Sequence, residues 1–406
     1  MTARWLPGDG PFFFEAAAGR PLGLKRSLDR ARRLAAQLGL NPLALPVCTV
    51  VGSKGKGSAA TAAAAFLECA GLQVVLVTSP PFRTNLERIR RSGRALSEAE
   101  YDRLGEVLAD GLSHLPPMEE GYLSPTGAYT LMGGRWAQEA GADVLVAEEG
   151  MGGTSDEVSL WHPVVVAVTP VFEEHLGILG DNLSDIVADE LGVVCSRTAA
   201  VVTGRQRNAL VEQAIAERAR CVGARVVASR EMLPGVAARW VPLVAANVMT
   251  GFSAANEFLG EMGSRVDFAA VGEQAAARLR LPGRHSVHQQ LGSTWVVDAA
   301  IDPVGVAASL AACRAKAGEP DLVLACFPDG KDVQGCAAVL DGLPVVWVRE
   351  GTGHLKFSML PEPSLLGRQA LELAMGRAPS LLLCVGTISW IAVVLDFLDV
   401  SLERLY

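Results

Sequence analysis

The chain has 406 residues, of which 50% are hydrophobic and 6% aromatic. This is enough apolar material for two or three folded domains, and it excludes a disordered protein. Its 36 Lys and Arg residues against 44 Asp and Glu residues give a net charge of −8, which argues against a broad nucleic-acid-binding surface. Any nucleotide should therefore meet a focused site. Only six of the basic residues are lysines, and Lys54 and Lys56 lie two positions apart in one Gly-rich stretch.

The eight cysteines show neither the spacing of a zinc site nor that of a disulfide framework. We interpret them as buried small hydrophobic residues of a protein in a reducing, cytoplasmic compartment. The N-terminal stretch lacks the features of a secretory signal. The two most apolar stretches, residues 59–79 and 380–395, are interrupted by polar residues and glycine, so we expect no membrane span.

Short runs rich in Val and Leu alternate with longer segments rich in Ala, Leu, Arg and Glu, which is typical of parallel sheets covered by helices. A Pro-Gly pair at 282–283 interrupts the alternation of strands and helices, which starts again after it. We therefore place a domain boundary near residues 281–288. The elements predicted before it are strands at 45–51, 73–78, 144–148, 164–169, 200–203 and 225–228 and a helix at 247–259. Those predicted after it are strands at 294–298, 322–327, 344–348 and 381–385 and helices at 303–317, 333–340, 365–375 and 388–398.

The strongest local signal is the stretch G-S-K-G-K-G-S at residues 52–58, which follows an apolar strand and opens an Ala-rich helix. In this context glycines let the backbone approach a polyphosphate, and the N–H groups of the helix N-terminus point at it. Lys56 would neutralise charge, and Ser58 can reach a magnesium ion. An ordinary strand-to-helix turn needs neither two lysines nor three glycines. The spacing differs from the regular Walker A motif, so alone it predicts only a phosphate loop.

Two further polar positions follow predicted strands. Glu148 ends the strand V-L-V-A-E, and in phosphate-loop proteins an acid at the tip of a neighbouring strand holds magnesium directly or through water. A solvated acidic turn is the alternative interpretation. His175 follows the strand at 164–169, and on the residues alone a lone histidine there is more often structural than catalytic.

These features, in this order, resemble the Mur ligase superfamily and, within it, the folylpolyglutamate and dihydrofolate synthases. The most detailed match is the ungapped run T-S-P-P-F-R-T-N-L-E-R-I-R at residues 78–90, followed by Gly93 and by Leu96-Ser97. It resembles the family segment T-S-P-H-L…N-E-R-I-R-I-N-G…I-S. The other matching segments are 52–58 (G-T-N-G-K-G-S), 148–153 (E-V-G-L-G-G), 174–175 with 179–180 (D-H…L-G), 281–284 (P-G-R), 298–303 (D-G-A-H-N-P), 330–332 (D-K-D) and 386–387 (G-S).

The resemblance implies an α/β protein with two domains and an active site in the cleft between them. Residues 1–284 would form a phosphate-loop ATPase domain with a parallel-rich sheet, and residues 285–406 a smaller Rossmann-like domain. It also implies an ATP- and magnesium-dependent ligase. In this family ATP phosphorylates a carboxylate, and an amine then attacks the acyl phosphate to give an amide.

The site residues are carried over by motif match. Lys56, Glu148 and His175 are the expected catalytic groups, and Ser58, Glu148 and His175 the expected metal ligands or metal-adjacent groups. For Lys331 a solvated turn lysine is an equal alternative, and for Asn247 a helix-packing role. The expected nucleotide-binding residues are Gly52, Ser53, Lys54, Gly55, Lys56, Gly57, Ser58, Asn247, Arg284, Asp298 and Lys331.

Several positions depart from the family pattern. Leu191 stands in place of the lysine of E-K-A-G, whose carbamate lies beside the second metal, and a leucine cannot bind a cation. Lys54 replaces an asparagine, and we hypothesise that its charge compensates for a lost second magnesium. On the acceptor side, Pro81 replaces the histidine of the family motif T-S-P-H, and Thr126-Gly127 stands where the folate enzymes carry Phe-Glu. These two departures argue against a pterin substrate. The remaining departures are Ile301-Asp302 for His-Asn, Leu243-Val244 for His-Gln and Thr154 for Arg.

The leading interpretation is an ATP-dependent ligase that joins a small carboxylate, other than folate, to an amine or amino acid such as glutamate. Two alternatives stay open: a true folylpolyglutamate or dihydrofolate synthase, and an ATP-binding pseudoenzyme or scaffold, for which Leu191 and Ile301 are the motivation. The expected partners are small molecules, not nucleic acid or membrane. The sequence leaves a monomer and a dimer equally open.

Overall fold

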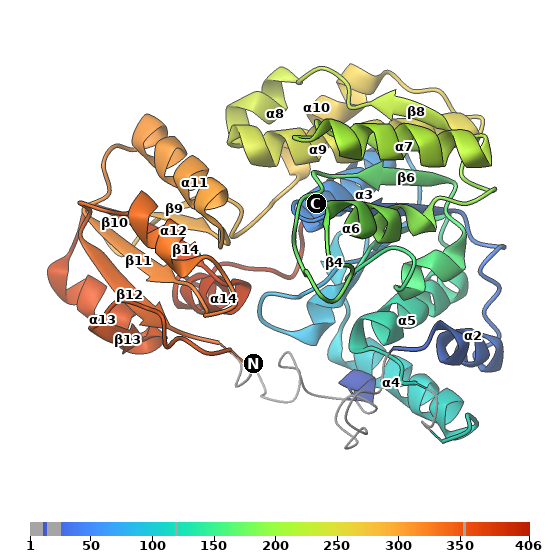
Figure 1. Ribbon diagram of the computed structural model, residues 1–406, viewed down its shortest axis with the longest axis horizontal. Coiled ribbons are helices and arrows are strands. Elements are labelled where there is room, and N and C mark those ends of the chain that lie inside the picture. Colours follow the sequence, from blue (N-terminus) through green and yellow to red (C-terminus); the bar gives the residue numbers. More distant parts are fainter. Residues whose placement is uncertain (1–10, 14–25, 118–120, 352–354) are drawn as a thin grey trace. The chain divides into compact units, whose positions relative to one another are not determined.

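The computed structural model describes residues 11–13, 26–117, 121–351 and 355–406, which form two compact units (Figure 1). The first unit contains the chain up to Arg239, together with Ala245–Leu279 and Glu403–Tyr406. The second contains Trp240–Val244 and Arg280–Leu402.

The first unit is built on an eight-stranded sheet with the order β4-β3-β2-β5-β1-β6-β7-β8. Its strands pair in parallel from β2 to β8, whereas β3 and β4 add an antiparallel hairpin at one edge. The central strands are apolar and buried along their whole length, as expected for a sheet covered on both faces. The strands are β1 (Val47–Val51), β2 (Val74–Val77), β3 (Ile89–Arg91), β4 (Arg94–Ala95), β5 (Val144–Glu148), β6 (Val165–Val168), β7 (Ala200–Thr203) and β8 (Arg225–Ala228).

Most of the covering helices begin at a side chain that caps them. Ser97 accepts from Glu100 N, while the Glu100 carboxylate returns to the Ser97 backbone, which forms a capping box at the start of α4. The helices are α2 (Leu28–Gln37), α3 (Lys56–Cys69), α4 (Glu98–Ser113), α5 (Pro125–Glu139), α6 (Leu183–Glu190), α7 (Ala209–Val222), α8 (Pro234–Arg239), α9 (Pro242–Glu261) and α10 (Phe268–Arg278). Short 3-10 turns are η2 (Pro11–Phe13), η3 (Asn85–Arg88), η4 (Glu157–Trp161) and η5 (Leu191–Val193).

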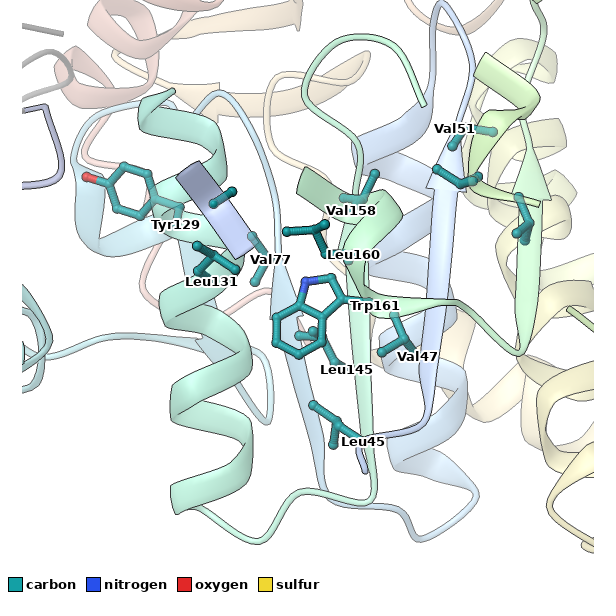
Figure 2. Close-up of a cluster of buried hydrophobic side chains, with 14 of the residues drawn as sticks. Leu45, Val47, Val51, Val77, Tyr129, Leu131, Leu145, Val158, Leu160 and Trp161 are labelled. Carbon is teal, nitrogen blue, oxygen red and sulfur yellow. The ribbon is translucent and has the colours of Figure 1, made fainter. Parts of the chain in front are cut away.

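The core of the first unit includes a fully buried tryptophan on η4. Figure 2 shows the indole ring of Trp161 among Val47, Leu145 and Leu160, which belong to the same buried cluster. The ring also lies directly against α5, where a Cβ on Gly134 would overlap it. A glycine in a helix interior is intrinsically unfavourable, so its presence here reflects the space that the indole occupies.

We expect the substitution Gly134→Ala to lower the free energy of unfolding by about 1 to 3 kcal/mol, because the new methyl group must displace the Trp161 ring. The matched control is Gly260→Ala near the end of α9, where an added Cβ meets nothing within 4 Å. That variant should be neutral or stabilised by up to about 1 kcal/mol, because alanine is the better helix former. Urea unfolding of both variants measures the difference, and equal stability would contradict the packing argument.

The second unit has a six-stranded sheet with the order β13-β12-β11-β14-β10-β9, in which only β9 is antiparallel to its neighbour. Apolar side chains of its strands and helices, among them Val323 and Val306, form a separate core. The strands are β9 (Ser286–Gln290), β10 (Ser293–Asp298), β11 (Leu322–Cys326), β12 (Val345–Arg349), β13 (Ser364–Leu366) and β14 (Leu381–Gly386). The helices are α11 (Pro303–Lys316), α12 (Val333–Val339), α13 (Gly367–Arg377) and α14 (Ile388–Phe397).

The predicted α/β class with a parallel-rich sheet and a second sheet is confirmed. The ten predicted strands occur, with ends shifted by at most two residues, but β3, β4, β9 and β13 were not predicted. The domain boundary near residues 281–288 stays a prediction. The two compact units also include segments out of chain order, Trp240–Val244 and Glu403–Tyr406.

Two further expectations concerned the burial of the cysteines and the absence of a membrane span. All eight cysteines are free, and five are buried. Cys69 and Cys195 are partly exposed and Cys221 is exposed, so the expectation that all of them are buried is wrong at Cys221 and holds only in part at the other two. The buried face of α7 is formed by Val211, Ile215 and Ala219, and Cys221 falls outside that spacing. Within the described ranges, no helix combines the length and the apolar character that crossing a bilayer would require.

Candidate active site

The phosphate loop connects β1 to α3 through two glycines that no other residue could replace without strain. Gly52 and Gly55 have φ values of 125° and 92°, in the region that favours glycine. A Cβ on Gly52 would overlap Thr169, and a Cβ on Gly55 would overlap the side chain of Asn247. Asn247 on α9 thus lies against the loop, and its role near the nucleotide stays a prediction.

Lys56 is the first residue of α3, and its ammonium group turns back into the loop. Its Nζ donates to Gly52 O at 2.5 Å and lies 4.0 Å from Glu149 Oε2, with 15% of the side chain exposed. Burial alone would lower the pKa of Lys56. The surrounding carboxylates, chiefly Glu149 and Glu190, outweigh burial and raise this pKa above its ordinary value. The charged form of Lys56 is therefore favoured at this position.

Two buried carboxyl groups lie behind the loop, and neither was among the predicted site residues. Gly52 N donates to Glu190 Oε2 at 2.8 Å and to Glu149 Oε2 at 3.3 Å. Burial raises the pKa of Glu149 well above its ordinary value; Lys56 opposes this rise, and Glu190 adds to it. Two adjacent buried carboxyl groups compete for ionisation, because the negative charge of one disfavours that of the other. In the sequence both glutamates lie inside quoted motifs, at the ends of β5 and α6.

Glu148 lies at the opening of the loop, where a metal ion would be expected. Its carboxylate is 5% exposed, and its Oε2 accepts from Ser79 N at 2.9 Å. A Cβ on Gly57 would lie 3.3 Å from both of its oxygens, and the next residue, Ser58, is buried in the first turn of α3. The structure therefore places Glu148 beside the first turn of α3, where Lys56, Gly57 and Ser58 lie; their roles as site residues stay predictions.

The donor types at this position fit magnesium. Among the described residues, no three His, Cys, Asp or Glu side chains are grouped to hold a metal ion by themselves. Mg²⁺ needs no such cage, since it is commonly bound by one or two carboxylates, a hydroxyl, water and substrate phosphates. Glu148 and Ser58 supply a carboxylate and a hydroxyl of this kind.

His175 is placed differently from the other predicted ligands. It lies on an exposed turn with φ 57°, and its carbonyl oxygen accepts from Ile178 N and Leu179 N. The left-handed backbone at His175 allows the chain to reverse toward Gly180, with which Leu176 forms an isolated bridge. The role of His175 as a metal ligand stays a prediction.

The neighbouring segment 170–174 is joined to the loop by Ser53 and Lys54. Ser53 Oγ donates to Phe172 O at 3.0 Å and accepts from Phe172 N at 3.0 Å. Lys54 Nζ forms an ion pair with the carboxylate of Glu174. The ammonium group that was expected to serve the nucleotide is therefore directed toward Glu174.

Leu191, at the position of the family lysine, is 3% exposed and belongs to the hydrophobic core of the first unit. The adjacent Glu190 points back to Gly52 N. An apolar side chain that is packed in the core offers no donor to a second metal ion.

A buried arginine on the other side of Glu148 was quoted in a family motif but was not predicted as a site residue. Arg88 Nη1 donates to Ser79 Oγ at 2.9 Å, and Nε donates to Asn85 Oδ1 at 3.0 Å. Its guanidinium lies over the ring of Tyr129, 4.6 Å from the centroid. Ser79 thus contacts Glu148 through its backbone and Arg88 through its side chain.

The two acceptor-side departures occur where side chains are closely packed. Pro81 is buried, and a Cβ on Gly127 would overlap the carboxyl group of Glu157, which accepts from Ser124 Oγ. Burial raises the pKa of Glu157 to about 8, with a further contribution from Asp156. A carboxyl group from η4 therefore fills the space beside position 127.

Three of the predicted nucleotide-binding residues, Arg284, Asp298 and Lys331, belong to the second unit. Arg284 and Asp298 lie together, since Ala299 N donates to Gly283 O at 2.9 Å. Burial raises the pKa of Asp298 to about 6, although the charge of Arg284 opposes this shift. Lys331 lies in the turn before α12, where its N–H donates to Pro328 O. Their contacts with a nucleotide stay predictions.

Comparisons with known proteins can now be set beside this geometry. No family model matches the chain. A probable bifunctional folylpolyglutamate synthase/dihydropteroate synthase of Haloferax volcanii is 35% identical over 199 residues, or 47% of this chain and 23% of the relative. The dihydrofolate synthase/folylpolyglutamate synthase of Mycobacterium tuberculosis is 26% identical over 394 residues, or 86% of this chain and 78% of the relative.

A solved structure of Mycobacterium tuberculosis folylpolyglutamate synthase, complexed with ADP and AMPPCP, has a TM-score of 0.79 at 21% identity. The alignment covers 93% of this chain and 96% of that one, and a likeness at this identity shows the fold. Among the four relatives with the strongest local matches, the chain spans only 20% to 40% of the relative's length.

Fold and loop together define a phosphate-loop α/β protein with a second α/β unit. The chain is a homologue of the folylpolyglutamate and dihydrofolate synthases, which belong to the Mur ligase superfamily. The predicted family resemblance is thereby confirmed.

The raised pKa values of Glu157 and of Asp156, which is raised to about 6, predict a pH-dependent stability. Between pH 5 and pH 8 these two groups bind more protons in the folded state than in the unfolded state, so their contribution to the free energy of unfolding should fall as the pH rises. A single buried carboxyl group contributes a slope of about 1.4 kcal/mol per pH unit at most. We expect Glu157→Gln to flatten this slope, as measured by urea unfolding at several pH values. The control Glu98→Gln, on the exposed surface, should leave the slope unchanged, and an unchanged slope in Glu157→Gln would refute the assignment.

Proposed function

We propose that this protein is an ATP- and magnesium-dependent ligase that forms ADP and joins a carboxylate to an amine. One observation carries the proposal: the loop from Gly52 to Ser58 presents a helix N-terminus, the cation Lys56 and the adjacent carboxylate Glu148 at one place. The homology to ligases of this type supports it.

The loop would bind the polyphosphate of ATP through the first N–H groups of α3, as helix N-termini bind anions. Lys56 would contact the phosphoryl group during its transfer, because its ammonium group is held at the loop and remains charged. Bound magnesium, held by Glu148 and Ser58, would neutralise the β and γ oxygens. His175 is the further predicted ligand.

The reaction has two chemical steps. A carboxylate oxygen of the substrate attacks the γ phosphorus of ATP, and ADP leaves, which gives an acyl phosphate. The amine nitrogen then attacks the acyl carbon, phosphate leaves, and the nitrogen loses a proton to give the amide. In both steps negative charge develops near the loop, where Lys56 and the backbone N–H groups are already in position.

For the acceptor we propose a small carboxylate other than folate. Support comes from Pro81 and from Gly127, where the Glu157 carboxyl group occupies the space that a side chain would need. The names of the homologues favour the second candidate, a true folylpolyglutamate or dihydrofolate synthase. Leu191, buried in the core, is the observation that favours an ATP-binding protein without ligase activity.

The test is release of ADP and phosphate with ATP, magnesium, glutamate and a panel of carboxylates that includes dihydropteroate and tetrahydrofolate. Dependence on one non-folate carboxylate supports the leading proposal, and dependence on a pterin compound supports the folate enzyme. Measurable ATP binding without turnover would refute ligase activity. Lys56→Met should reduce turnover by about 100-fold or more, whereas Lys316→Met, on α11 of the second unit, should not.

The ion pair of Lys54 with Glu174 gives a sharper test of the compensation hypothesis. If Lys54 supplies charge to the nucleotide, Lys54→Asn should reduce turnover much more than stability, and Glu174→Gln should leave turnover unchanged or raise it. If the ion pair only anchors segment 170–174, both variants should lose activity to a similar extent. Steady-state kinetics with thermal unfolding of the same samples distinguishes the two, and full activity of Lys54→Asn would end the hypothesis.

A further inference from the structure

A basic pocket lies on the first unit, outside the phosphate-loop site. It has a volume of about 460 Å³, and the residues that matter for its chemistry are Arg91, Arg94, Arg404, Glu100, Gln73 and Trp136. Three guanidinium groups thus line one cavity of a chain whose net charge is −8. None of these residues belongs to the loop or to the groups around Glu148.

The pocket and the phosphate loop lie toward opposite ends of the strands of the sheet. Gln73 directly precedes β2, and Arg91 pairs with Val75 near that end of the strand. The other end of β2 leads to Ser79, which contacts Glu148. Because β2 has four residues, its two ends are about 10 Å apart. A ligand in the pocket would therefore be separate from a nucleotide at the loop.

One wall of the pocket comes from the C-terminal segment Glu403–Tyr406, which returns to the first unit. Ala95 N donates to Glu403 O at 2.8 Å, and Leu405 N donates to Gly93 O at 3.0 Å. Arg90 Nη1 also donates to Glu403 O, at 3.0 Å. These bonds fix the segment against the β3–β4 hairpin and hold Arg404 beside the hairpin arginines.

The arginines of the pocket differ in how far their charge is neutralised. Arg404 Nε donates to Tyr406 O at 2.7 Å, and the charge of Arg404 lowers the pKa of Glu68 against the larger effect of burial. Within the described part of the chain Arg91 forms no ion pair. Arg94 pairs with Glu403 at 3.3 Å, but both side chains are about two-thirds exposed, and such a pair contributes about 1 kcal/mol or less. The Glu100 carboxylate is used to cap α4, where its Oε2 accepts from Ser97 N and Ser97 Oγ. Guanidinium groups bind phosphate and carboxylate oxygens in pairs.

We propose that this pocket binds a small polyanion with phosphate or carboxylate groups, which bridges Arg91 and Arg94 of the hairpin to Arg404 of the C-terminal segment. The bound anion strengthens the attachment of that segment to the first unit. The site is a second ligand site, and its existence does not depend on the proposed ligase activity.

The test uses the full chain with Lys56→Met, so that binding at the phosphate loop is weakened. Calorimetric titrations with pyrophosphate and with citrate, without magnesium and at constant ionic strength, measure the affinity and distinguish the two anion classes. We expect saturable binding, weakened about tenfold or more by Arg91→Gln or Arg404→Gln. Glu403→Gln should strengthen binding, because it releases Arg94. The matched control is Arg32→Gln, an exposed arginine of α2, which should bind as the parent does.

Hydrogen exchange gives a second readout, which is independent of the calorimetric signal. The amide of Leu405 should exchange more slowly when the anion is present, and this protection should be lost in Arg404→Gln. Absence of saturable binding up to about 1 mM of either anion, which is already weak for a specific site, would overturn the proposal. Equal affinities in the Arg91, Arg404 and Arg32 variants would overturn it as well.

Discussion

A lysine ammonium group enclosed beside a phosphate loop must be neutralised by its surroundings, and the site of the first unit is arranged around this requirement. Lys56 lies within reach of Glu149, Glu190 and Glu148, which come from the ends of β5 and α6. Because buried charges are costly unless paired, these elements must end at the same edge of the sheet. The charge of Lys56 therefore links the conformation of the loop to the position of α6 and to the acidic residues at the end of β5.

Small residues make this arrangement possible. A Cβ at position 57 would crowd the Glu148 carboxylate, and position 55 favours a glycine both by its backbone conformation and by its contact with Asn247. Farther along, a Cβ on Gly251 would overlap the backbone of Ala59, so α9 approaches α3 at close range. Close contact between α3 and α9 brings Asn247 to the loop, which links the packing of the core to the geometry of the site.

Much of the fold follows from local sequence, because central strands such as β1 and β5 are continuous apolar runs between turns. The same holds for the phosphate loop, where glycines, lysine and serine carry a physical signal at fixed spacing. The hairpin strands β3 and β4 were missed because they are short and rich in arginine. Their pairing depends on partners far along the chain, and Arg90 contacts Glu403 across 313 positions.

The site shows the same division between local and long-range signals. Glu149 and Glu190 were visible only as members of motifs, and their shared contact with Gly52 N depends on how β1, β5 and α6 meet. The Glu157 carboxyl group fills the space that a side chain at position 127 would need. Sequence spacing could not predict this contact, since the two residues lie on different elements. Conversely, Lys54 was correctly singled out as unusual, but its partner Glu174 depends on the path of the chain after β6.

The return of Glu403–Tyr406 to the first unit gives the chain an unusual connectivity. The second unit is inserted within the first, since its main segment is preceded and followed by residues that belong to the first unit. A single backbone cut between Leu279 and Arg280 would therefore leave the C-terminal fragment attached to the first unit through the hydrogen bonds of the returning segment. Limited proteolysis of this protein should yield nicked chains that co-purify under native conditions and separate only after denaturation.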